Sequence, residues 1–308
     1  MSSEPFLSND LFLLYADLVL DKLYSWDDLN QQVIPPKKYG ILVRTEYLDA
    51  YIPWLLAFPH RFVLLTTCND DYCMPYESFP PNVQKKKLHD SLLACTNMVY
   101  WRTKNPSIRH PKVKGLPLGP KWQYQSYDFF GEDKQPILEV LHRHGTTPLA
   151  LFESEKPNFV YVNFDVRTTV SPFYQPHKNV RELLMNRCRE EGWKVSPSKE
   201  YETYLQELKT YKFCMAPPGR GIDTHRVWES LMVGTIPIMV TSPMDSLYEE
   251  LPVVIIKNVS QISKEYLEKE YLNLKKRRYK FEQLYSPYWK KRAYSDLNRD
   301  YESQSLVC

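Results

Sequence analysis

The sequence has few cysteines, and they do not show the spacing that a metal site would use. The 308 residues include six cysteines, and no two of them form a CxxC pair. Structural zinc sites draw their ligands from such closely spaced pairs. A zinc finger or zinc ribbon is therefore excluded, and we expect reduced, mostly buried thiols. Internal repeats and low-complexity segments are also missing.

Excess charge and long apolar runs are absent as well. The formal net charge is +3, which is too small to indicate nucleic-acid binding, and no RNA- or DNA-binding motif is present. The first apolar stretch, Leu11–Leu20, is interrupted by Asp17, follows no basic segment and is too short to cross a bilayer. We therefore expect no nucleic-acid partner, no membrane span and a cytoplasmic location, unless an N-terminal anchor has been trimmed.

Residues 211–240 carry most of the information about function. Tyr211–Ala216 is apolar apart from one lysine, which predicts a buried strand, and a loop with two prolines and two glycines follows it. Asp223 stands where a helix N-cap is expected, and Ile236–Val240 predicts a second strand. Strand, loop, helix and strand form a βαβ unit. Its loop and helix N-terminus lie at the ligand-binding edge of a parallel sheet and favour anions.

The helix of this unit places an arginine and a glutamate on one face. At about 100° per residue, Ile222, Arg226, Glu229 and Val233 align. The arginine is placed to pair with a diphosphate, and the deeper carboxylate to accept from the two hydroxyls of a ribose. Each feature alone is also compatible with a plain turn or a surface ion pair. Together with Arg220, they indicate a nucleoside diphosphate site.

The first half of the sequence predicts another parallel sheet. Gly40–Val43, Tyr47–Phe58 and Arg61–Thr67 read as strand, helix and strand. Polar residues follow in the segment TTCNDDYCMPY, at the strand end that faces a cleft in such a domain. Asp71, with Asp70 in reserve, is a candidate base for an acceptor hydroxyl, and an Asx turn is an equal alternative on the residues alone. The adjacent aspartates lack the spacing of a metal-binding DxD pair, so we expect no metal.

The remaining elements follow from periodicity and turn residues. Residues 1–36 predict one or two helices around Leu11–Leu23. Further helices are expected at Lys85–Cys95, Ile137–His144, Asn179–Glu190, Lys199–Leu208 and Tyr266–Arg278, and further strands at Met98–Trp101, Phe159–Phe164 and Leu251–Ile256.

The run FCMAPPGRGIDTHRVWESLMVGTIPIMV follows an FxxxPxGxGxDxHRxWExLxxGxIPI-type pattern. In this it resembles exostosin-like glycosyltransferases, especially compact forms from large viruses and algae. The resemblance is strong over residues 205–257 and recognisable over residues 61–122. It implies an α/β fold of the GT-B type, with two Rossmann-like domains whose parallel sheets face a central cleft. It also implies metal-independent, cofactor-free, inverting sugar transfer from a nucleotide-sugar donor to a glycan acceptor, in the host cytoplasm if the protein is viral.

The resemblance also implies roles for particular residues. Asp71 and Pro75 match the spacing of a DxxxP-type loop, which favours the base over the turn. The donor is expected to contact Arg220, Gly221, Asp223, Arg226, Glu229, Arg167 and Ser242, and the acceptor Asp70, His110 and Trp122. Residues 1–125 would form the acceptor-side domain, with residues 287–308 crossing back to it, and residues 126–286 the donor domain.

The resemblance points to a UDP-sugar as donor and to xylose as a plausible sugar. The alternative from another class is a catalytically silent protein that binds a nucleotide sugar or a glycan. It would keep Arg226 and Glu229 but lack a usable base. A nucleotide hydrolase would need a P-loop lysine or an acidic metal-binding pair, and the PPGRGID loop has neither.

Overall fold

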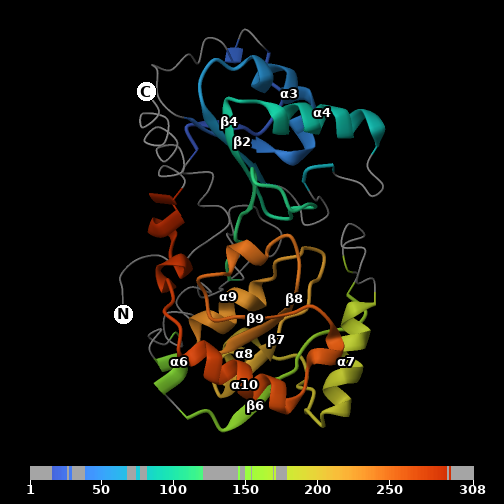
Figure 1. The fold of residues 1–308 in the computed structure, drawn as a ribbon, viewed down its shortest axis with the longest axis vertical. Helices are drawn as coiled ribbons and strands as arrows, with labels where there is room; N and C mark the ends of the chain where they lie inside the picture. Colours follow the sequence, from blue (N-terminus) through green and yellow to red (C-terminus); the bar gives the residue numbers. More distant parts are fainter. Residues whose placement is uncertain are drawn as a thin grey trace.

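The computed structural model describes residues 16–25, 28–29, 39–67, 74–76, 82–120, 145, 150–153, 155–168, 170, 179–289 and 291–292. Two parallel β-sheets, each accompanied by helices, lie one above the other along the long axis of the molecule (Figure 1). The predicted α/β class with two parallel sheets is confirmed. Among the described residues, the first sheet falls within 1–125 and the second within 126–286.

The first sheet has five described strands, all parallel, in the order β1-β2-β3-β4-β5. Its central strands β2 and β3 are rich in valine and leucine and mostly buried, as is typical of strands covered on both faces. The strands are β1 (Leu18–Leu20), β2 (Tyr39–Arg44), β3 (Phe62–Thr67), β4 (Met98–Thr103) and β5 (Val113–Gly115).

Two helices, α3 (Leu48–Ala57) and α4 (Val83–Ala94), cover one face of this sheet (Figure 1). Ile41 of β2 packs in one buried cluster with Leu55 of α3 and Leu92 of α4. The other face contributes to a cluster that it shares with the second sheet. The first sheet is thus a layer between its own helices and the rest of the molecule.

Leu18–Leu20 form a strand rather than part of the helix expected around Leu11–Leu23. This strand, β1, pairs in parallel with Ile41–Val43. The carboxylate of Asp17 accepts a hydrogen bond of 2.7 Å from the backbone N–H of Gly40. A partner some 20 residues away therefore decides the conformation, and local periodicity does not reveal it. The short strand β5, which pairs in parallel with Trp101–Thr103 of β4, was not predicted either.

The second sheet has four described strands, all parallel, in the order β6-β7-β8-β9. The predicted strands of the βαβ unit are confirmed as β7 and β8. Just beyond β6, Val162 pairs with Val195 in an isolated parallel bridge, on the edge of β6 away from β7. The strands are β6 (Asn158–Tyr161), β7 (Tyr211–Met215), β8 (Ile236–Val240) and β9 (Val254–Ile256).

Helices cover both faces of the second sheet. The side chains of successive residues in a strand point to opposite faces, and neighbouring residues of β7 belong to different clusters. Cys214 packs with α8 and α9, whereas Phe213 packs with α7 and α10. These helices are α7 (Val180–Glu190), α8 (Tyr201–Leu208), α9 (His225–Met232) and α10 (Lys264–Lys275). Short elements complete the described fold: η1 (Thr45–Tyr47), α6 (Ala150–Glu153), η3 (Asp245–Leu247), η4 (Val259–Gln261) and η5 (Phe281–Leu284).

The two sheets share one hydrophobic cluster. Leu42 and Leu65 of the first sheet lie in it with Trp228 and Tyr248 of the second half. The halves are packed so closely that there is no room for a side chain at Gly115, where an added Cβ would lie 2.7 Å from the sulfur of Met244. The halves are therefore joined by buried apolar surface.

Polar groups also join the halves. The side-chain oxygen of Asn105 accepts from the backbone N–H of Ile222 at 2.9 Å. The guanidinium of Arg109 donates to the carboxylate of Asp245 at 2.6 Å. The first bond fixes the loop before α9 against the first half of the chain, and the second fixes η3, which follows β8.

Some predicted elements lie outside the described residues, among them the helix Ile137–His144.

Tyr288 and Trp289, at the start of the tail, line a cavity of about 420 Å³ with Tyr100 and Lys114 of the first sheet. No helix within the described ranges is long and apolar enough to span a bilayer.

Candidate functional site

A cavity of about 490 Å³ opens at the carboxyl ends of β6 and β7. After β6 the chain runs to Val195, which pairs with Val162 on one side of β6. It then returns through α8 to β7, which pairs with the other side of β6. Such a reversal leaves a crevice in which α/β proteins bind ligands. The cavity is lined by Asn163, Phe164, Arg181, Ser198, Lys199, Glu200, Tyr201, Tyr204, Pro217, Thr224, His225, Arg226 and Glu229.

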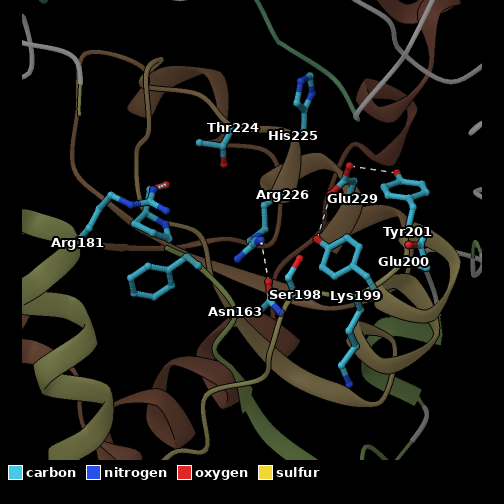
Figure 2. A pocket seen from close by; sticks show the side chains of 13 residues that line it. Asn163, Arg181, Ser198, Lys199, Glu200, Tyr201, Thr224, His225, Arg226 and Glu229 are labelled. Carbon is cyan, nitrogen blue, oxygen red and sulfur yellow. Dashed lines mark hydrogen bonds between the residues drawn. The ribbon is translucent and has the colours of Figure 1, made fainter. Parts of the chain in front are cut away.

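Helix α9 supplies two charged side chains to this cavity. Arg226 and Glu229 lie three residues apart, about one turn, and both face the cavity from the same side of the helix (Figure 2). The opposite side of α9 buries Val227, Trp228 and Leu231 in the shared hydrophobic cluster. Of the four residues aligned in the sequence, Arg226 and Glu229 share the cavity face. Ile222 precedes the helix and Val233 is its C-cap, and both are buried in the shared cluster.

Arg226 has capacity for a further ligand. One terminal nitrogen, Nη2, donates a long hydrogen bond of 3.4 Å to the side-chain oxygen of Asn163 (Figure 2). The other, Nη1, is buried and has no hydrogen-bond partner among the described residues. Thr224 Oγ1, in the same cavity, is also buried and has no hydrogen-bond partner within the described part of the chain. A buried donor left unsatisfied costs free energy, so an anion bound here would be stabilised by this arginine.

Glu229 is held by two tyrosines of α8. Tyr201 donates its hydroxyl to Oε1 at 3.1 Å, and Tyr204 donates to Oε2 at 3.0 Å. Burial raises the pKa of both phenols, and the adjacent carboxylate raises it further. Both hydroxyls therefore stay protonated at neutral pH and act as donors. The carboxylate of Glu229 thus lines the cavity while two phenol hydroxyls hold it in place.

Arg181 is a cavity residue that the sequence analysis did not identify. It stands in the first turn of α7, and its guanidinium donates to the carbonyls of Asp165 at 2.8 Å and Pro218 at 2.7 Å. The guanidinium also lies 5.2 Å from the ring centroid of Phe164. Burial lowers its pKa to about 10, and the neighbouring charge of Arg226 acts in the same direction. Two arginines thus converge on one cavity, as a diphosphate would require.

Asp223 does not cap α9, because the N-cap is Thr224. Its carboxylate is buried and accepts hydrogen bonds from Trp228 Nε1 at 2.7 Å, Tyr248 OH at 2.7 Å and Leu118 N at 2.8 Å. Burial raises the pKa of this carboxyl group. The prediction was one residue off because the aspartate is drawn inward by donors from three segments, which a cap pattern does not reveal.

Four other predicted residues do not line the cavity. Arg167 is exposed at the surface and pairs with Asp165 at 2.8 Å. Arg220 is exposed as well, and Gly221 is buried against Asn105. Ser242 is buried, and its carbonyl accepts from Arg109 at 2.6 Å.

The acceptor-side predictions remain untested. His110 is half-buried, and its Nδ1 accepts from the backbone N–H of Lys112 at 3.1 Å, away from the cavity. Asp70, Asp71 and Trp122 lie outside the described residues. Within the described ranges, no three His, Cys, Asp or Glu side chains form a metal-ligand set.

Residues 146–271, less than half of the chain, match the family profile described as the exostosin GT47 domain. This range contains the cavity and both arginines. The match supports an exostosin-like glycosyltransferase. The sequence resemblance is thereby confirmed at the level of the family domain, whereas the likeness to viral and algal xylosyltransferases is not tested.

Other comparisons add the following. No curated protein matches the sequence significantly. A UDP-forming α,α-trehalose-phosphate synthase from Burkholderia xenovorans is similar in structure, with 9% identity over 88% of this chain and 76% of that chain and a TM-score of 0.42. A trehalose-6-phosphate structure from E. coli bound with UDP-2-fluoro glucose has 10% identity, coverage of 88% and 75%, and a TM-score of 0.37. Such low TM-scores do not establish a function.

Proposed function

We propose that the protein is an inverting glycosyltransferase that moves a sugar from a UDP-sugar to a hydroxyl of a glycan acceptor without a metal ion. The observation that carries the proposal is that Arg226 and Glu229 both line one cavity. Arg226 Nη1 is buried there and has no hydrogen-bond partner among the described residues. The exostosin GT47 match over the same residues supports the reaction class.

In this proposal the diphosphate lies between Arg226 and Arg181. Both guanidinium groups reach the cavity, and a guanidinium forms strong, paired hydrogen bonds to phosphate oxygens. The ribose lies deeper, at Glu229, where a carboxylate accepts from its two hydroxyls. Negative charge grows on the diphosphate as it leaves, so donors already fixed in place there lower the barrier.

The acceptor hydroxyl would lose its proton to Asp71 as its oxygen attacks the anomeric carbon from the face opposite the leaving group. The bond from that carbon to the diphosphate oxygen breaks in the same step, which releases UDP and inverts the anomeric configuration. Xylose is the first donor sugar to test, because the sequence resembles enzymes that include xylosyltransferases.

The first experiment is calorimetric titration with UDP, GDP and ADP and with UDP-xylose and UDP-glucose, in buffer that contains EDTA. We expect the wild type to bind UDP, and Arg226→Ala and Glu229→Ala each to weaken that binding about tenfold or more, the usual cost of losing hydrogen bonds to a charged group. Arg167→Ala is the matched control. It removes an exposed arginine outside the cavity and should leave the affinity unchanged.

Absence of binding to every nucleotide would overturn the proposal, and binding only after a divalent metal is added would overturn its metal-free part.

A second experiment measures sugar transfer by Asp71→Asn, which should keep the affinity for the donor and lose transfer. Retained transfer in this variant would remove Asp71 as the base. The anomeric configuration of the product, read by NMR, tests inversion.

A further inference from the structure

We propose that Tyr204 is a positioning residue that makes this cavity selective for ribonucleotides, an inference that rests on the function proposed above. Tyr204 lies between the two charged side chains of α9. Its hydroxyl donates to Glu229 Oε2 at 3.0 Å, and its ring centroid lies 5.7 Å from the guanidinium carbon of Arg226. One side chain therefore contacts both the ribose-binding carboxylate and the phosphate-binding arginine.

The ring of Tyr204 is buried beside two other aromatic rings. It is 8% exposed, and the ring centroids of Tyr161 and Tyr201 each lie 6.0 Å from its own. Tyr204 and Tyr201 are three residues apart on α8, so both present their hydroxyls to the same carboxylate. A phenol held this firmly can fix the rotation of the carboxylate that accepts its hydrogen bond.

The two tyrosines hold Glu229 in different surroundings. The bond from Tyr204 is buried, whereas the bond from Tyr201 is only partly buried. Buried hydrogen bonds to a charged group contribute more than solvent-exposed ones. Tyr204 therefore orients the carboxylate that Glu229 presents to the cavity, where the proposed function places the ribose.

The chain supplies a matched control in Tyr161. Its hydroxyl also donates to a carboxylate, Glu207 Oε2, at 3.0 Å, and its side chain is buried beside Tyr204. It does not line the cavity. Tyr161→Phe thus removes the same kind of bond without touching Glu229.

The experiment is calorimetric titration of the wild type, Tyr204→Phe and Tyr161→Phe with UDP, 2′-deoxy-UDP and inorganic diphosphate. We expect the wild type to bind UDP about tenfold more tightly than 2′-deoxy-UDP, the value of one hydrogen bond to a carboxylate. Tyr204→Phe should reduce this ratio several-fold and leave the affinity for inorganic diphosphate within about twofold, because its ring still lies against Arg226. Tyr161→Phe should keep the wild-type ratio.

The outcomes separate this inference from the proposed function. A wild type that does not bind UDP overturns the proposed function itself. If UDP binds but Tyr204→Phe keeps the wild-type ratio, or the wild type does not discriminate, only the role of Tyr204 is overturned. Equal loss of UDP and inorganic diphosphate in Tyr204→Phe would show that the hydroxyl merely supports the fold, and would also overturn the inference.

Discussion

At the scale of single residues, Asp223 is a buried carboxylate whose donors come from both halves of the chain. Replacing it with alanine leaves Trp228 Nε1, Tyr248 OH and Leu118 N buried without their acceptor. Each buried donor without an acceptor costs roughly 1–3 kcal/mol. We expect Asp223→Ala to lower the free energy of unfolding by about 3 kcal/mol or more, measured by urea denaturation.

Asp165→Ala is the control for this prediction, because that side chain is exposed and its ion pair, among the described residues, is with exposed Arg167. A surface ion pair contributes about 0–1 kcal/mol. If both aspartate variants changed the free energy of unfolding by the same amount, the buried hydrogen bonds of Asp223 would contribute nothing of their own.

The same scale shows how far sequence reasoning reaches. Arg226 and Glu229 were predicted because helical spacing alone puts them on one face of α9. Tyr201 and Tyr204 come from a different helix, and no local pattern joins them to Glu229. Arg181 was missed in favour of Arg167, since both follow β6 and only the fold decides which guanidinium turns into the cavity.

At the scale of elements, the loop before α9 is fitted closely to the first half of the chain. A Cβ at Gly221 would lie 3.0 Å from Asn105 Oδ1 and 3.2 Å from the backbone oxygen of Asp223. The same Asn105 oxygen accepts from Ile222 N. We expect Gly221→Ala to lower the free energy of unfolding by about 1–2 kcal/mol, as overpacking does.

Gly219→Ala tests the same loop without the steric conflict, because its nearest contacts would be 3.7 Å and 3.8 Å away. Its unfolding free energy should stay within about 0.5 kcal/mol of the wild type. Urea denaturation of both variants is the measurement. Equal stability of the two would mean that the loop relaxes freely and that the bond between Asn105 and Ile222 is not part of its support.

The elements that the sequence predicted are those with strong internal patterns. The strands β7 and β8 are apolar runs bounded by turns, and their positions are confirmed. The strand bonds of β1 and β5 are made to distant segments, and each strand has three residues, too few for a periodic signal. Long-range pairing, rather than propensity, determines them.

At the scale of the whole molecule, the two sheets are joined mainly by buried surface. Leu42 and Leu65 from one sheet share a cluster with Trp228, Met244 and Tyr248 from the other half. The sequence predicted two parallel sheets, but it could not show this shared cluster, because its members are far apart in the chain. Burial of apolar area is the dominant favourable term in folding, so the halves should unfold together.

We therefore expect a single calorimetric transition whose van't Hoff and calorimetric enthalpies agree. Arg109→Ala should preserve the single transition although it removes the hydrogen bonds to Asp245, Thr241 and the Ser242 carbonyl. The Arg109 side chain is 61% exposed, so its ion pair is worth at most about 1 kcal/mol, and the melting temperature should fall by only a few degrees. Arg44→Ala, which breaks an exposed ion pair with Glu46 inside the first half, should lower the melting temperature by a similar amount.

Two resolved transitions in the wild type would show that the shared cluster does not couple the sheets. A split confined to Arg109→Ala would assign the coupling to the surface bonds instead.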